Sequence, residues 1–163
     1  MRRHTHLPAA LVAAVLVLTG APPALADTVD GDWHDNVLRG TDGPDTVSGR
    51  GGDDRLHGRG GRDLLVGGPG DDVLRDVLWV DGARNLADKV RDGLRGGKGD
   101  DVIRAGQNDV VRAGPGNDRV YGFAADRGTY LDCGAGKDVL HLFADITYER
   151  IRNCETIRVH QDG

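Results

Sequence analysis

Residues 40–75 decide the fold, because they form four consecutive units of nine residues: GTDGPDTVS (40–48), GRGGDDRLH (49–57), GRGGRDLLV (58–66) and GGPGDDVLR (67–75). Each unit has glycine at its first and fourth positions, aspartate at its sixth and an aliphatic residue at its eighth. We expect the glycines at these two positions to supply the positive φ angles of a tight turn. One aliphatic residue in nine predicts a thin core, and a fixed short period indicates a solenoid.

The period extends beyond this block in both directions. On the N-terminal side, Gly31, Asn36 and Leu38 occupy the glycine, acid and aliphatic positions of a degenerate unit. On the C-terminal side, units occur at 96–104, 105–112, 113–121 and 133–141. The unit 105–112 is one residue short, so Asp101 and Asp118 are seventeen residues apart instead of eighteen. The aspartates of such units can either bind a metal ion or lie in ordinary Asp-Gly turns with solvated carboxylates and no metal. The second interpretation remains open, above all for the block 96–121.

The composition excludes several classes of protein. The 163 residues include 26 glycines and 26 acidic residues, of which only Glu149 and Glu155 are glutamates, and aromatic residues make up 4%. Aspartate favours turns and metal loops, so long amphipathic helices and coiled coils are not expected. The net charge of −5 argues against a nucleic-acid-binding protein.

The units resemble the glycine- and aspartate-rich nonapeptide G-G-x-G-x-D-x-U-x of RTX (hemolysin-type) calcium-binding proteins, where U is a large aliphatic residue. The resemblance covers roughly residues 35–141. It implies an all-β fold, a right-handed parallel β-roll in which six residues turn, three form a strand and two units complete one coil. It also implies that calcium binds between the stacked turns.

The spacing of the acids supports a metal site independently. With two units per coil, sixth-position residues eighteen apart stack directly, as Asp45 does with Asp63 and Asp54 with Asp72. Two carboxylates facing one gap repel each other unless a cation with six to eight oxygen ligands lies between them. The expected calcium-ligating side chains are Asn36, Asp45, Asp54, Asp63, Asp72, Asp101, Asp109, Asp118 and Asp138. The resemblance adds backbone carbonyls of the turn glycines Gly43, Gly52, Gly61, Gly70, Gly99 and Gly116.

Both ends of the chain carry further signals. Residues 1–26 contain two arginines, an apolar run from 7 to 18 and the sequence Ala-Leu-Ala, which predicts a secretory signal peptide and a secreted, extracellular protein. Cys133 and Cys154 predict a disulfide bond in such a protein. The apolar segment that begins at Leu140 predicts a C-terminal cap held by this bond.

The expected organisation is therefore a signal peptide (1–26), an N-terminal cap with the first repeat block (27–75), an interruption (76–95), a second block (96–121), and a last degenerate repeat with the cap (122–163). Leu86 and Val90 have helical spacing within the interruption. This segment is either an excursion with a short helix or a degenerate coil that keeps Leu94 inward. Trp79 is interpreted as a packing residue, with partner binding as the alternative.

The sequence predicts a secreted, non-catalytic calcium-binding protein that calcium folds, with no nucleic-acid partner and no membrane span. Catalytic parts are missing, because Ser48 is the only serine and no H-E-x-x-H motif occurs. One alternative is an adhesion or matrix module that binds a surface polymer or protein; another is an accessory module of a secreted enzyme. Outward arginines such as Arg55, Arg104 and Arg119 are interpreted as a solvated face.

Overall fold

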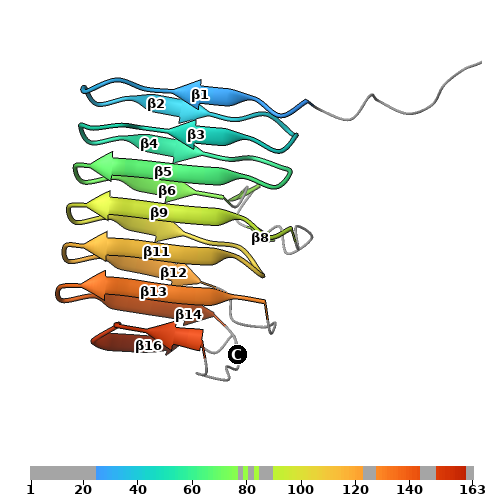
Figure 1. Cartoon of the computed structure of the whole chain (residues 1–163). Helices are drawn as coiled ribbons and strands as arrows, with labels where there is room; N and C mark the ends of the chain where they lie inside the picture. Colours follow the sequence, from blue (N-terminus) through green and yellow to red (C-terminus); the bar gives the residue numbers. More distant parts are fainter. Residues whose placement is uncertain are drawn as a thin grey trace, which may run out of the picture.

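The computed structural model describes residues 25–76, 79–80, 83–84, 90–122, 128–143 and 150–160. Over these residues the chain winds into a right-handed parallel β-solenoid, with β1 at one end and β16 at the other (Figure 1). This confirms the predicted all-β roll, and the described residues form no α-helix. None of them lies in a helix long and apolar enough to cross a membrane. The predicted signal peptide falls largely on residues 1–24, outside the described residues.

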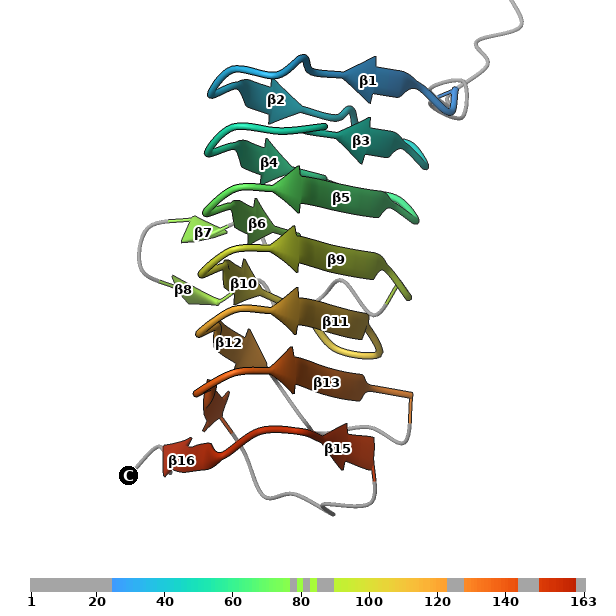
Figure 2. The ribbon, with the colours of Figure 1, turned by 60° about the vertical axis from the view of Figure 1, so that its left-hand side comes forward.

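Each coil contributes one strand to each of two seven-stranded sheets, in which all neighbours are parallel. Sheet A contains β1 (Thr28–Asp30), β3 (Thr46–Ser48), β5 (Leu64–Pro69), β9 (Gly93–Lys98), β11 (Val110–Pro115), β13 (Tyr130–Ala135) and β15 (Ile151–Arg152). Sheet B contains β2 (Val37–Arg39), β4 (Arg55–His57), β6 (Val73–Arg75), β10 (Val102–Arg104), β12 (Arg119–Gly122), β14 (Val139–Phe143) and β16 (Thr156–His160). The short strands β7 (Trp79–Val80) and β8 (Ala83–Arg84) form an antiparallel hairpin that projects from the solenoid (Figure 2).

The core consists of two facing columns of aliphatic side chains, one from each sheet. Sheet A supplies Val29, Val47, Leu65, Leu94, Val111, Leu131 and Ile151, which are paired in register from strand to strand. Sheet B supplies Leu38, Leu56, Leu74, Ile103, Val120, Leu140 and Ile157 in the same way. The interior members of both columns are at most 1% exposed. With so thin a core, apolar burial alone stabilises the fold weakly.

The four central strands of sheet A are longer than the sequence predicted. β5, β9, β11 and β13 each span six residues instead of three. The reason is that the first part of the following turn remains extended and pairs with the next coil, as Gly68 does with Gly97 and Gly114 with Gly134.

The connections on the two edges of the solenoid differ in regularity. We call the segments that lead from sheet A to sheet B the A-turns (31–36, 49–54, 67–72, 96–101, 113–118, 133–138 and 153–155) and those that lead back the B-turns (40–45, 58–63, 76–92, 105–109, 122–129 and 143–150). All A-turns except the shorter last one have the same length, whereas the B-turns contain every insertion and the one-residue deletion. The shortened repeat therefore does not disturb the stacking of Asp101 with Asp118.

The positive φ angles differ from the prediction, because they occur at the second and fourth positions of the turns and not at the first. Gly68 and Gly70 have φ of 124° and 135°, and later A-turns repeat the pattern. At the second position Arg50 and Arg59 also have positive φ, 78° and 86°. Such angles cost a non-glycine residue roughly 1–2 kcal/mol, so these two repeats carry backbone strain.

The interruption and the C-terminal segment both continue the solenoid. β9 begins at Gly93, inside the expected interruption, and Leu94 is fully buried. The short helix expected near Leu86, and the side chain of Trp79, lie outside the described residues. At the C-terminus β15 and β16 add one further coil, which the predicted disulfide between Cys133 and Cys154 joins to β13.

Candidate metal centre

A column of acidic side chains runs through the A-turns, one per coil. In each step a backbone N–H donates to a carboxylate oxygen one coil further on, which is Oδ1 of an aspartate except in the last step, where it is Oε2 of Glu155, with N–O distances of 2.8 to 2.9 Å. We call this column the inner ladder; it consists of Asn36, Asp54, Asp72, Asp101, Asp118, Asp138 and Glu155. The sequence separations are 18, 18, 29, 17, 20 and 17, yet the stack is continuous.

The five aspartates of the inner ladder are buried, with at most 1% of each residue exposed. While Oδ1 accepts a backbone N–H, the buried Oδ2 of each aspartate makes no hydrogen bond with any residue that the structure describes. A buried polar atom without a partner costs about 1–3 kcal/mol, and more for a charged group. The alternative of solvated carboxylates in ordinary turns is therefore wrong for these residues. The arrangement requires either protons or a cation.

The unpaired oxygens face a cradle of backbone oxygens. A Cβ placed on Gly67 would clash with Asp72 Oδ2 and lie 2.6 Å from the carbonyl oxygen of Gly96 in the next coil. Gly49 and Gly96 are surrounded in the same way by an Oδ2 and a carbonyl oxygen. First-position glycine is thus explained by this close approach and not by its φ angle. Carboxylate and carbonyl oxygens that converge in this way are the ligands preferred by Ca²⁺.

The fourth-position glycines, whose carbonyls the sequence proposed as ligands, lie close to the backbone of the neighbouring coil. A Cβ on Gly70 would clash with the carbonyl oxygen of Gly52, and one on Gly99 with that of Gly70. The carbonyls of Gly43 and Gly99 approach Gly61 and Gly116 similarly. These carbonyls therefore point along the solenoid axis toward the neighbouring coil.

Burial controls the protonation of the inner ladder. It raises the pKa of Asp72 and Asp118 to about 6 and that of Asp101 to about 7, with neighbouring carboxylates adding to the effect. Burial raises the pKa of Asp54 and Asp138 as well. The ionised form of these carboxyl groups is disfavoured because they are buried beside other carboxylates. A bound divalent cation would favour the ionised form by supplying positive charge.

A second column of acids follows the B-turns. The backbone N–H groups of Asp45, Asp63 and Asp92 donate to the Oδ1 of Asp63, Asp92 and Asp109 at 2.8, 2.6 and 3.1 Å. Asp45 differs from the inner ladder: although burial acts to raise its pKa, hydrogen bonds from Thr41 and Asp27 lower it. The structure thus stacks the three predicted acids Asp45, Asp63 and Asp109 in one column, together with Asp92, which the sequence analysis did not name.

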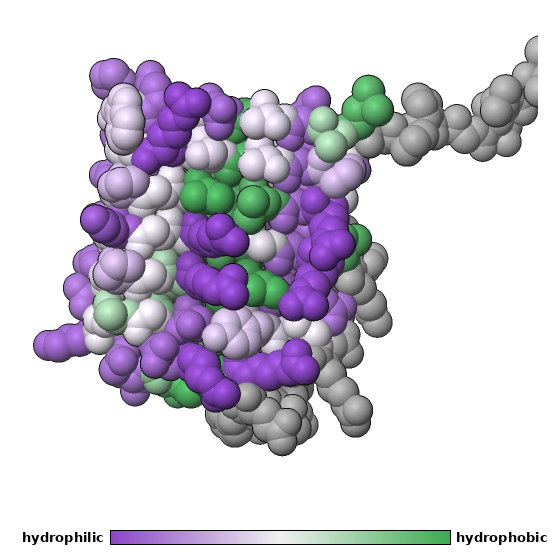
Figure 3. All heavy atoms as spheres, viewed as in Figure 1, coloured by the Kyte–Doolittle hydropathy of each residue, from purple (hydrophilic) through white to green (hydrophobic). Residues whose placement is uncertain are grey.

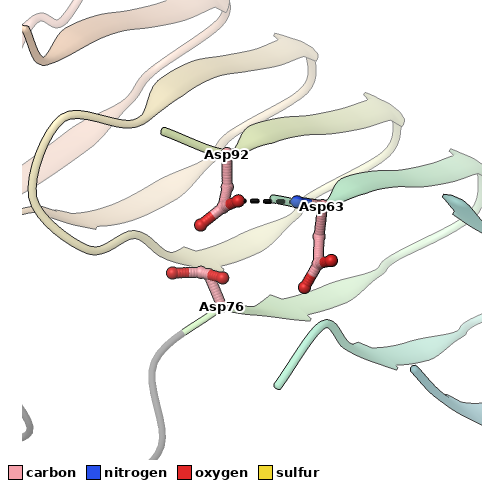
Figure 4. Close-up of side chains that lie close together, drawn as sticks. All are labelled: Asp63, Asp76 and Asp92. Carbon is pink, nitrogen blue, oxygen red and sulfur yellow. Dashed lines mark hydrogen bonds between the residues drawn. The ribbon is translucent and has the colours of Figure 1, made fainter. Parts of the chain in front are cut away.

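The B-turn column contains a cluster of three carboxylates, Asp63, Asp76 and Asp92 (Figure 4). One oxygen of each lies within 4.8 Å of those of the other two, and the residues are 4%, 4% and 2% exposed. Sequence reasoning missed Asp76 and Asp92, because the long insertion between them hides the period. A signal was present, since Asp92 precedes the inward Leu94 by two residues, as Asp63 precedes Leu65.

The exposed side of the A-turns has a ladder of its own, which the sequence analysis also missed. Fifth-position residues bond in the direction opposite to the inner ladder: the N–H groups of Asp71 and Asp100 donate to Oδ1 of Asp53 and Asp71 at 2.9 and 2.8 Å. This outer ladder consists of Asp35, Asp53, Asp71, Asp100, Asn117 and Lys137. It aligns neighbouring turns, while its exposed carboxylates stay in water.

Comparison with known families agrees with this geometry. The sequence matches a model of the RTX calcium-binding nonapeptide repeat in four copies, at residues 26–47, 39–74, 91–120 and 106–126, which together span more than half of the chain. The comparison with curated proteins found no match.

Proposed function

Because the chain belongs to the family of RTX calcium-binding nonapeptide repeat proteins, we propose that calcium bound along its acidic ladders folds it into the β-roll. The inner-ladder carboxylates and the first-position carbonyls are the ligands in this proposal. The B-turn acids Asp45, Asp63 and Asp109 form a second row, to which Asp76 and Asp92 are added.

One observation carries the proposal: five consecutive coils bury a carboxylate oxygen that makes no hydrogen bond within the described part of the chain. Ordering the backbone costs about 1–2 kcal/mol per residue, and a core of one aliphatic side chain per strand offsets only part of this. Calcium binding supplies the remainder, because a site that exists only in the folded chain couples binding to folding.

We place this protein outside the cell and assign it a structural role without catalysis. Three features support the placement: the signal-like N-terminal sequence, the Cys133–Cys154 disulfide, which is typical of oxidising compartments, and dependence on an ion that is abundant outside cells. The role follows from the position of the acids, which are buried between stacked turns.

Calcium stoichiometry tests the proposal. Equilibrium dialysis of the secreted chain is expected to show several bound ions, and Asp72→Asn is expected to remove at least one. Asp71→Asn is the matched control, since it makes the same change on the exposed outer ladder and keeps an oxygen for the N–H of Asp100. Equal losses in both variants, or no bound calcium, would contradict the proposal.

A second candidate function, adhesion to an anionic surface polymer, is favoured by the outer face of sheet B. Its described strands contain no acidic residue. They carry the cations Arg39, Arg55, Arg75, Arg104, Arg119 and Arg158, together with His57, His141 and His160. The protein would be tested for retention on immobilised polygalacturonate. Retention would support this role if salt reverses it and if the double substitution Arg75→Gln and Arg104→Gln abolishes it. Absence of retention at low salt would exclude it.

A further inference from the structure

The outer face of sheet A contains a hollow of about 220 Å³, which lies outside the inner and outer ladders and borders Asp63 and Asp92 of the B-turn column. It is lined by Arg62, Asp63, Leu64, Arg91, Asp92, Gly93, Arg95, Val110 and Arg112. Figure 3 shows this face, where hydrophobic atoms in the middle of the sheet are flanked on both sides by strongly hydrophilic side chains.

The hollow exists because a glycine interrupts an outward row of side chains. Leu64, Gly93 and Val110 are paired in register on β5, β9 and β11. Gly93 has no side chain, so its backbone forms the floor between two aliphatic walls. The gap is narrow, since a Cβ on Gly93 would lie 3.2 Å from Cδ1 of Leu64.

Arginine side chains lie at both ends of this hollow, which we call the slot. Arg95 lies two residues after Gly93 on β9, so its side chain leaves the sheet on the outer side, where the missing side chain of Gly93 would lie. Arg91 lies two residues before Gly93, just ahead of the strand, and lines the other end of the hollow. Arg62 and Arg112 extend the two ends onto the neighbouring coils.

None of these four arginines forms an ion pair with another described residue; the ion pairs among the described residues are Arg50–Asp30 and His34–Asp32. Arg112 lies over the ring of Tyr130, 5.8 Å from its centroid. The two acids that border the hollow, Asp63 and Asp92, are buried, and their carboxylates face Asp76 (Figure 4). Like charges on adjacent strands repel each other. An anion in the slot would relieve the repulsion.

We propose that this slot binds a small organic dianion, a flat ring with an acidic group at each of two opposite ends. The ring lies over Gly93 between Leu64 and Val110, and the two acidic groups accept hydrogen bonds from arginines at the two ends. Arginine suits this task because its planar guanidinium binds carboxylate, sulfate or phosphate in a bidentate manner. The volume admits one substituted ring, which is smaller than a typical drug-sized ligand.

Calorimetry on the calcium-loaded full chain tests the inference, with terephthalate as the probe. Terephthalate is expected to bind more tightly than benzoate, which has one acidic group, and than succinate, which has no ring. Arg95→Gln is expected to weaken terephthalate by about tenfold through loss of charge-assisted hydrogen bonds. Gly93→Ala is expected to weaken it by narrowing the slot. Arg104→Gln, on sheet B, is the matched control and should leave binding unchanged.

Calcium-dependent circular dichroism of every variant separates this inference from the proposed function. A chain that folds with calcium but binds no terephthalate at millimolar concentration overturns the slot and leaves the calcium proposal intact. Equal weakening by Arg95→Gln and Arg104→Gln also overturns it, because the attraction would then come from overall charge.

Discussion

Replacing Asp101 by asparagine should have opposite effects on the calcium-free and the calcium-bound chain. Asp101 is fully buried, and burial raises its pKa from 3.8 to about 7. A pKa difference of one corresponds to about 1.4 kcal/mol. Above pH 7 the ionised carboxylate therefore destabilises the calcium-free fold by up to about 4 kcal/mol.

Asparagine removes this charge and preserves the main contact. Its Oδ1 can still accept the N–H of Asp72, which donates to Asp101 at 2.9 Å. Its amide nitrogen would replace Oδ2 beside the carbonyl oxygen of Ala113, an acceptor for the new N–H. The calcium-bound chain instead loses a charged ligand and should need more calcium to fold.

The assay is folding in chelator at about pH 8 by titration with the osmolyte TMAO, which favours the compact state. Asp101→Asn should fold at a lower osmolyte concentration than the native chain, and the advantage should shrink near pH 5. Asp100→Asn is the control, because Asp100 is exposed and hydrogen bonds from Asn117 lower its pKa. If Asp101→Asn needs as much osmolyte as the native chain at pH 8, the carboxylate does not oppose folding and the reasoning fails.

Three further outcomes are expected. In chelator the β signal should fall as pH rises from about 5 to 8, because the folded inner ladder holds protons that the unfolded chain has released, whereas saturating calcium should remove this fall; a signal that rises with pH in chelator would have the wrong sign. Gly67→Ala should destabilise the calcium-bound fold by about 1–3 kcal/mol through its clash with Asp72, while Gly60→Ala, whose Cβ would meet nothing closer than 3.8 Å, should be nearly neutral in the same denaturant titration. Reduction of the Cys133–Cys154 bond, which spans 21 residues, should lower stability by about 3 kcal/mol and leave calcium binding by the first repeat block; complete loss of calcium binding would show that the bond supports the whole roll.

The regular part of the fold could be predicted because one period determines both the turn and the strand. Val47 and Leu65 are inward, and Asp54 stacks on Asp72, at the places that a repeat of nine assigns. This succeeds along the A-turns from 31–36 to 133–138 because their length does not change. The disulfide was predictable from two cysteines in a sequence that begins with a signal-like segment.

The B-turn edge could not be predicted to the same extent, because insertions there break the period without breaking the stack. Asp92 is separated from Asp63 by 29 residues, and only its position before Leu94 reveals its place. Glu155 was missed because it is not an aspartate, although it accepts the N–H of Asp138 at 2.8 Å. The positive φ at the second position was hidden by Arg50 and Arg59, since a sequence pattern does not reveal strain that surrounding contacts impose.

The outer ladder illustrates a different limit. Asp53, Asp71 and Asp100 recur at the fifth position, so the sequence contained the pattern. Nothing in composition distinguishes an acid that accepts a hydrogen bond from the next turn from one that is only solvated. The backbone geometry of the stacked turns makes that distinction.

Circular dichroism of the chain from Asp27 onward, recorded during a calcium titration with magnesium as the control, tests whether calcium folds the solenoid. We expect a chain with little β signal in chelator, which gains β signal cooperatively near millimolar calcium and does not gain it with magnesium. A full β spectrum at neutral pH in chelator, unchanged by calcium, would contradict the claim that the ion folds the solenoid.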